Sequence, residues 1–117
     1  MADERIHKMS LGGVYPYYLA KVEKKGRTQA ELDEVILWMT GFTAAELQAN
    51  LDAKTPFGEL FAAGKNLNPA RSLVTGVICG VRIEEITDPV VREVRILDKL
   101  VDELAKGRPM AKILRQP

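Results

Sequence analysis

The sequence predicts an all-α fold, a single domain over residues 1–117 with about five or six short helices packed orthogonally. Two observations predict it. Segments with a helical period of apolar residues fill most of the chain, and capping residues, glycines or prolines interrupt them at short intervals. The length of 117 residues and the apolar fraction of 46% suit one ordinary hydrophobic core. An α+β fold with a short hairpin near residues 77–87 is the alternative.

The first predicted helix runs from about Val14 to Lys25 and ends at Gly26. Pro16 then falls in the first turn, where a missing backbone amide costs nothing. The lysines of the last turn suit the negative end of the helix dipole. These signals together indicate both ends of the helix.

Two helices with capping boxes are predicted next. Thr28 with Glu31, and Thr43 with Glu46, place a hydroxyl and a carboxylate where they satisfy the first amides of a helix. Gly41 ends the first of the two helices. The apolar stripe of that helix has the spacing i, i+3, i+4, i+7 and comprises Leu32, Val35, Ile36 and Met39.

Two further helices are predicted to begin after Thr55 and Asn68, each of which is followed by a proline suited to the first helical position. The second of them is expected to continue to about residue 81, because its apolar residues have helical spacing. However, Gly76 and Gly80 each weaken a helix by about 1 kcal/mol. The apolar residues also alternate there, so the hairpin stays open as the alternative.

The clearest helix is predicted to begin at Asp88, with Pro89 in its first turn, and to end at Gly107. Asp102 is placed to pair with Lys106 one turn later. Residues 109–116 form a final short helix or tail. The apolar stripe of the long helix comprises Val90, Val94, Leu97, Val101 and Leu104.

Residues 28–47 have the outline of a helix-turn-helix DNA-binding motif, but two features argue against it. The glycine of the turn, Gly41, comes eleven positions after the small residue Ala30, which makes the first helix too long for that compact corner. Residues 28–52 also carry five acids and no lysine or arginine. Since DNA affinity depends largely on phosphate neutralisation, these helices would repel DNA.

The composition excludes several classes of protein. No apolar run approaches the roughly 18 residues that span a bilayer, and the N-terminal residues lack the apolar region of a secretory signal, so we expect a cytoplasmic protein without a membrane partner. A single histidine, His7, and a single cysteine, Cys79, provide neither a metal cluster nor a convincing nucleophilic triad. Cys79 is interpreted as a small buried hydrophobic residue. No metal, cofactor or catalytic residue is therefore predicted, and an enzyme is not favoured.

The net charge of +1 is unevenly distributed. Residues 21–27 carry four bases and one acid, and Lys21 and Arg27 are candidate binding residues on this basic face. Tyr15 precedes them in the same helix and, with Tyr17 and Tyr18, could stack on nucleic-acid bases. A solvated lysine face with half-buried tyrosines is the favoured interpretation, so nucleic acid is not expected as a partner.

A second set of candidates lies between residues 71 and 95. Arg71, Arg82 and Glu85 could line an anion or small-molecule pocket, because a guanidinium matches a carboxylate or phosphate. Ion pairs that fix a chain reversal are the favoured interpretation of this set. Trp38 is the only tryptophan, and it is interpreted as a core residue with an interface anchor as the alternative.

The chain resembles a bacterial family known as domain of unknown function 2200. The resemblance extends over nearly the whole length, and it implies a small, mainly helical domain with orthogonally packed helices. It implies no reaction, cofactor or catalytic residue. Its carriers are VYPYYLAKVEKKGRT (14–28), WMTGF (38–42), LNPARSLVTGVICGVRIEEITDP (67–89) and VREVRILDKLVDELAKG (91–107).

These observations lead us to expect a binding or protein-interaction module whose partner is another protein or a second copy of the chain. Docking would use an apolar or aromatic patch rimmed by charge. A small-molecule or anion-binding protein, or an enzyme that uses the Arg71, Arg82 and Glu85 set, is the alternative. Nucleic-acid binding through residues 21–27 is the weaker alternative.

Overall fold

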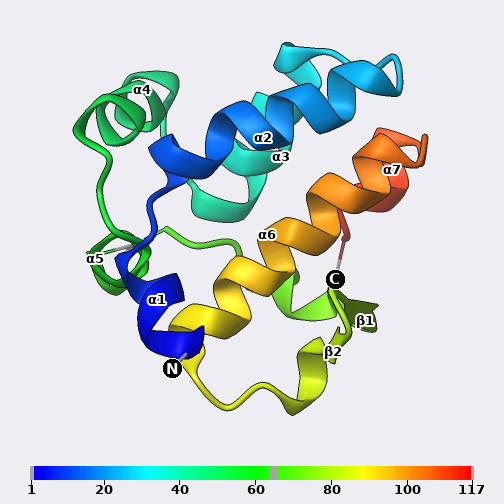
Figure 1. Cartoon of the computed structure of the whole chain (residues 1–117). Helices are drawn as coiled ribbons and strands as arrows, with labels where there is room; N and C mark the ends of the chain where they lie inside the picture. The colour runs from blue at the N-terminus through cyan, green and yellow to red at the C-terminus, as the bar shows by residue number, and fades with distance from the viewer. Residues whose placement is uncertain (1, 64–65, 117) are drawn as a thin grey trace.

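One long helix, α6 (Pro89–Ala105), forms the centre of the structure, a computed structural model that describes residues 2–63 and 66–116. The Asp88 side chain caps it by accepting hydrogen bonds from the amides of Val90 and Val91, and Pro89 occupies its first position. Helices α1, α2, α3, α5 and α7 all pack against it (Figure 1). Its buried face includes Val91, Val94, Leu97, Leu100, Val101 and Leu104.

Five helices precede α6, and they cross it and one another at varied angles (Figure 1). Helix α2 lies against α3, α4 and α6, whereas α1 and α5 lie at the N-terminal end of α6. This arrangement confirms the predicted all-α class with steeply crossing helices. Their bounds are α1 Ala2–Lys8, α2 Leu11–Lys24, α3 Gln29–Thr40, α4 Ala44–Ala53 and α5 Phe57–Ala63.

Both predicted capping boxes are present. The Thr28 hydroxyl accepts from the Glu31 amide while the Glu31 carboxylate accepts from the Thr28 amide, and Thr43 and Glu46 repeat this exchange at α4. Gly41 ends α3 with φ of 71°, as predicted. The local signals therefore identified the ends of these helices correctly.

The predicted start of the first long helix was wrong. Helix α2 begins at Leu11, because the Ser10 hydroxyl caps it by accepting from the Gly13 amide. Pro16 consequently lies in the second turn, where its missing amide leaves the Gly12 carbonyl without its helical donor. A serine cap with two glycines in the first helical turn is a weaker sequence signal than a proline, although Ser10 marks the true start of this helix.

The prediction of a helix from Asn68 to about residue 81 was also wrong, and the hairpin alternative is confirmed. A 3-10 helix, η1 (Pro69–Leu73), is followed by the antiparallel strands β1 (Val77–Ile78) and β2 (Val81–Arg82) and then by η2 (Ile83–Glu85). The turn between the strands consists of Cys79 and Gly80, which have φ of 52° and 77°. Positive φ at two successive residues is the geometry of a tight hairpin turn, and it is incompatible with a continued helix.

Cys79 is exposed, which corrects its interpretation as a buried hydrophobic residue. The reason is its position in the hairpin turn, where the side chain points away from the core. Its neighbour Ile78 is buried instead and belongs to the core. The final helix, α7 (Met110–Ile113), follows α6 and matches the predicted short C-terminal helix.

Helix α1 is held to the start of α6 by the only histidine. The His7 Nε2 donates to both carboxylate oxygens of Asp88, at 2.8 and 3.0 Å, and the same carboxylate caps α6. The hydrogen bond from His7 lowers the pKa of Asp88 below its ordinary value, assisted by the amides of Val91 and Val90. Helix α1 is therefore anchored to the start of α6 through His7.

A dependence of stability on acid follows from this lowered pKa. A carboxyl group with a lower pKa in the folded state stabilises the fold above its unfolded pKa, and this contribution is lost as the pH falls through the folded pKa. We expect the thermal midpoint of the wild type to fall more steeply below about pH 4 than that of Asp88→Asn, because asparagine keeps the cap and removes the charge. Calorimetry between about pH 2 and pH 6 measures the difference.

The control for this prediction is His7→Ala, which removes the donor and leaves the cap intact. In an NMR titration of the carboxyl group, the pKa of Asp88 should rise in this variant. An unchanged value would show that His7 is not the cause of the lowered pKa.

Candidate functional site

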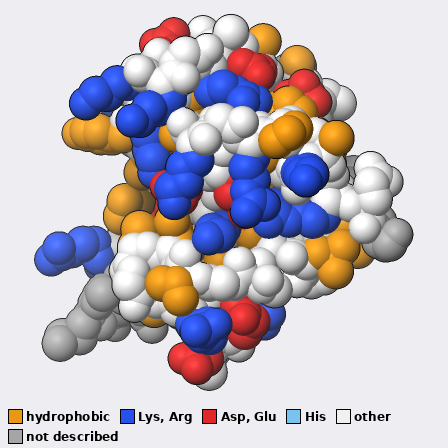
Figure 2. All heavy atoms as spheres, turned by 90° about the vertical axis from the view of Figure 1, so that its right-hand side faces the viewer, with side chains coloured by type: hydrophobic (Ala, Val, Ile, Leu, Met, Phe, Trp, Pro, Cys, Tyr) orange, Lys and Arg blue, Asp and Glu red, His pale blue; other side chains and the backbone are white. Residues whose placement is uncertain are grey.

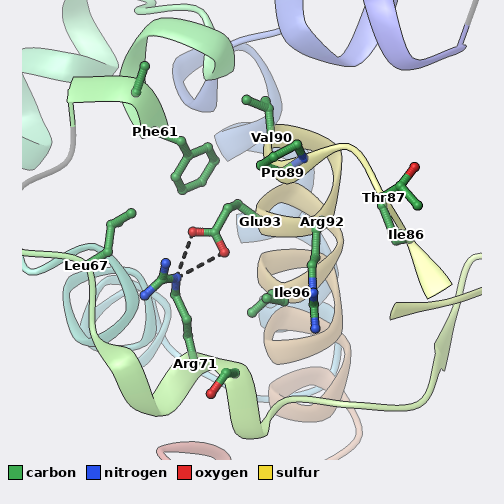
Figure 3. A pocket seen from close by; sticks show the side chains of 12 residues that line it. Phe61, Leu67, Arg71, Ile86, Thr87, Pro89, Val90, Arg92, Glu93 and Ile96 are labelled. Carbon is green, nitrogen blue, oxygen red and sulfur yellow. Dashed lines mark hydrogen bonds and ion pairs between the residues drawn. The ribbon is translucent and has the colours of Figure 1, made fainter. Parts of the chain in front are cut away.

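A hollow of about 590 Å³ lies between α5, η1 and the first half of α6. Its wall is mostly apolar and includes Phe61 of α5, Leu67, and Val90 and Ile96 of α6 (Figure 3). A volume of this size falls within the range of ligand pockets in proteins. We refer to it as the first hollow.

A partly buried ion pair lines the first hollow. The Arg71 Nε donates to both oxygens of Glu93, at 2.7 and 3.0 Å, and Arg71 Nη1 donates to the Asn68 carbonyl at 2.9 Å (Figure 3). The Glu93 side chain is only 12% exposed. These bonds use Nε and Nη1, so the Nη2 donors of Arg71 stay available to a bound group.

A second hollow of about 420 Å³ adjoins the first one. Val81 and Arg82 of β2 and Glu85 of η2 line it, together with Val91 and Arg95 of α6. Ile86 and Thr87 line both hollows, so this pair forms the ridge between them. The hairpin that replaces the predicted helix thus forms one wall of the second hollow.

The rim of the two hollows carries one unpaired charge of each sign. In the described part of the chain, Arg92 beside the first hollow and Glu85 beside the second make no ion pair, and both are exposed. Arg82 lies 3.8 Å from Glu84 and is half exposed, so its pairing is weak. A ligand that crossed the ridge would therefore meet a base on one side and an acid on the other.

Exposed apolar side chains continue the surface beyond the hollows. Leu73 is the last residue of η1 and is 45% exposed, while Val77 and Val81 on the hairpin are 50% and 37% exposed, and Val81 also lines the second hollow. Few large apolar side chains in the described residues are so exposed, and three of them gather on this segment. Such clustering is typical of docking surfaces.

The structure separates the predicted arginine and carboxylate set into two places. Arg71 lines the first hollow, whereas Arg82 and Glu85 line the second, so the three do not form one pocket. Sequence reasoning missed Glu93 and Phe61, which complete the first hollow. Glu93 lies 22 positions after Arg71, and no local pattern indicates that pairing.

The other predicted site residues lie away from the hollows. The Tyr15 hydroxyl donates to Asp33 at 2.5 Å and accepts from Gln29 at 3.0 Å, which ties α2 to α3. Burial, followed by the hydrogen bond to Asp33, raises the pKa of Tyr15 to about 12. Trp38 is half-buried and packs against the core, and its role as an interface anchor stays a prediction.

Lys21 and Arg27 connect the C-terminal ends of α2 and α6. Lys21 lies 3.3 Å from Asp102, and Arg27 donates to the Arg108 carbonyl at 3.1 Å. Arg27 also pairs with Glu31 at 2.9 Å. Both residues therefore have structural partners, in addition to any role on a basic surface.

Two kinds of site are not found in the part of the chain that the structure describes. Within residues 2–63 and 66–116, no group of three or more His, Cys, Asp or Glu side chains is arranged to hold a metal ion. None of the described helices is both long and apolar enough to cross a membrane.

Comparisons with known proteins agree on a family and a fold. A family described as "Uncharacterized protein conserved in bacteria (DUF2200)" matches residues 5–115. The chain is also similar to a solved structure titled "Crystal structure of uncharacterized protein SP1917", with 41% identity and a TM-score of 0.86 over 95% of this chain and 91% of the other. No curated protein matches the chain.

Proposed function

Because the chain belongs to the DUF2200 family, whose description names no activity, we propose a function from the surface of the molecule: it is a protein-interaction module. In this proposal, a segment of a partner protein docks across the ridge of Ile86 and Thr87 and places one apolar group in each hollow. The observation that carries the proposal is the pair of adjoining hollows with a shared ridge.

The extent of the surface favours a protein segment over a single small ligand. A small ligand would fill one concave site, whereas a peptide presents side chains at regular intervals to neighbouring pockets. The exposed side chains of Leu73 and Val77 add apolar area beside the hollows that only a larger partner would cover.

The unpaired charges define the polarity of the partner segment. Arg92 would attract an acidic residue beside the group in the first hollow, and Glu85 would attract a basic residue beside the group in the second. A partner in the reverse orientation would bring like charges together. The proposed ligand is thus a segment with two apolar anchors, acidic at one end and basic at the other.

Selection from a random peptide library displayed on phage tests this proposal. Peptides that bind the wild-type protein should share two apolar anchors with an acidic residue near one of them. Ala62 lines the first hollow on the exposed side of α5, so Ala62→Trp should fill it and weaken binding of the selected peptides more than about tenfold.

Ala49→Trp is the matched control, because Ala49 is an exposed helical alanine on α4, outside both hollows. It should leave peptide binding unchanged.

When the library is selected against the Arg92→Glu variant, the acidic residue shared by the peptides should be replaced by a basic one. Peptides without common anchors, or equal binding to the Ala62→Trp variant, would contradict the proposal, and light scattering would reveal a second copy as the partner instead.

The Arg71 guanidinium supports a second candidate, a small anionic ligand with an apolar body bound in the first hollow alone. Its free Nη2 donors and the apolar wall match a carboxylate on an alkyl chain. Titration with octanoate and with octanol, followed by amide chemical shifts, distinguishes binding of a small anion from binding of a protein segment. Shifts around the first hollow with octanoate and none with octanol would favour this candidate.

A further inference from the structure

The C-terminal ends of α2 and α6 lie side by side and bring two basic segments together. The Arg27 side chain donates to the Arg108 carbonyl, and Lys21 reaches Asp102, so residues 21–31 and 102–115 form one surface. In Figure 2 this end of the molecule faces the viewer, and Lys and Arg side chains gather across the middle and upper part of the face. We refer to this surface as the basic end.

The basic end keeps free positive charge after its ion pairs are counted. Its two segments contain eight bases and four acids. Three of the acids are already paired, since Asp102 binds Lys21 and Lys106, Glu31 binds Arg27, and Glu103 binds Arg115. The exposed bases that form no ion pair with a described residue are Lys24, Lys25, Arg108 and Lys112.

An exposed aromatic ring extends the basic end along α2. Tyr17 is 77% exposed, and Lys21 and Lys24 follow it at i+4 and i+7, on the same side of the helix. The other two tyrosines of the helix are engaged, because Tyr15 donates to Asp33 and Tyr18 donates to Asp98. Folding thus leaves one of the three rings free to stack on a ligand.

We propose that the basic end binds single-stranded nucleic acid. Lys24, Lys25, Arg108 and Lys112 contact phosphates, and a base stacks on the ring of Tyr17. Exposed bases along a backbone track, with an aromatic ring beside them, are the general features of single-strand binding. A paired base offers its face to its neighbours in the duplex, so stacking on Tyr17 selects an unpaired strand.

An anionic membrane fits this surface less well. Interfacial binding needs a continuous apolar face that enters the acyl boundary. Among the large apolar side chains that the structure describes as exposed, only Tyr17 lies beside the basic end, whereas Leu73 ends η1 and Val77 and Val81 lie on the hairpin. The charge attracts any polyanion, and the isolated aromatic ring favours a nucleic acid.

Fluorescence anisotropy with labelled oligothymidylate and oligouridylate of about 15 nucleotides tests the proposal, a length near the upper site size of one small binding domain. The wild type should bind at low ionic strength. The logarithm of its association constant should fall with the logarithm of salt concentration with a slope of about −3, which corresponds to roughly four phosphates on a single strand.

Three variants separate charge from stacking. Lys24→Glu combined with Lys25→Glu should weaken binding more than about tenfold and make the salt slope shallower. Tyr17→Ala should weaken it by about tenfold, and Tyr17→Phe should keep the wild-type affinity because the ring remains. All three positions are exposed, so circular dichroism should show an unchanged fold.

Lys8→Glu is the matched control, because Lys8 is an exposed base on α1, away from the basic end. It should bind like the wild type. Absence of binding at low salt, loss of binding with Lys8→Glu equal to that of the double variant, or insensitivity to Tyr17→Ala would overturn the proposal. Preferential binding to phosphatidylglycerol vesicles or to polyglutamate would also overturn it.

Discussion

Replacement of Arg115 by alanine is expected to lower the free energy of unfolding by about 3–5 kcal/mol, because it leaves a buried carboxylate without its partner. Arg115 donates to both oxygens of Glu103, at 2.5 and 2.8 Å, and to the Ile113 carbonyl at 2.8 Å. Glu103 lies on α6 and its side chain is only 5% exposed. Urea denaturation followed by circular dichroism measures the loss.

Two controls test the cause of this effect. Lys106→Ala removes an ion pair with Asp102 on the same helix, but Lys106 is 72% exposed, so the cost should stay below about 1 kcal/mol. A double variant, Glu103→Leu with Arg115→Leu, should recover most of the stability, since no buried charge remains. Equal losses from Arg115→Ala and Lys106→Ala would contradict the assignment of a buried pair.

Replacement of Gly41 by alanine is expected to lower the free energy of unfolding by about 3 kcal/mol, for two reasons that act together. Gly41 has φ of 71°, a left-handed conformation that side chains disfavour. A Cβ at this position would also overlap the carbonyl oxygen and the side chain of Asn66, which lies against the end of α3. Thermal and urea unfolding measure the change.

Gly26→Ala separates these two causes. Gly26 ends α2 with φ of 83°, and no described atom lies within 4 Å of the position of its Cβ. Alanine there should cost only about 1 kcal/mol, the strain of the left-handed conformation alone. If the two glycine variants lose the same stability, the close approach of Asn66 contributes nothing.

Helix α6 connects the two proposed binding surfaces. Its first half lines both hollows through Val90, Val91 and Arg95, and its last turn belongs to the basic end through Asp102, which pairs with Lys106 just after the helix. The two surfaces share no binding residue, so each proposal can be tested without disturbing the other. A chain that binds both a protein segment and a nucleic acid would hold the two on one rigid helix.

Prediction of the candidate site succeeded only for individual residues. Arg71, Arg82 and Glu85 were singled out because guanidinium and carboxylate groups bind charged ligands, and all three line hollows. Their division between two hollows was not predicted, since it depends on the hairpin. Likewise, the tyrosines before residue 21 suggested stacking, but the sequence did not distinguish Tyr17 from its neighbours.

The sequence by itself determined the features that depend on neighbouring residues. Caps such as Thr28 and Thr43 satisfy amides three residues away, and Asp88 does so at α6, so these helix ends can be read from local spacing. The apolar stripe of α6 is equally local. The all-α class follows, because such stripes need a surface to pack against and the sequence has no convincing series of strands to supply a sheet.

Only the tertiary structure decided two kinds of feature: contacts between residues that are distant in the sequence, and segments whose local preferences compete. Helix and hairpin had similar local support after Leu73, and burial of Ile78 and Ile83 in the core favoured the hairpin. The bond between His7 and Asp88 joins residues 81 positions apart, which no sequence period encodes. Long-range packing thus stabilised the hairpin over the helix, because it buries apolar area, and the hairpin in turn forms a wall of the second hollow.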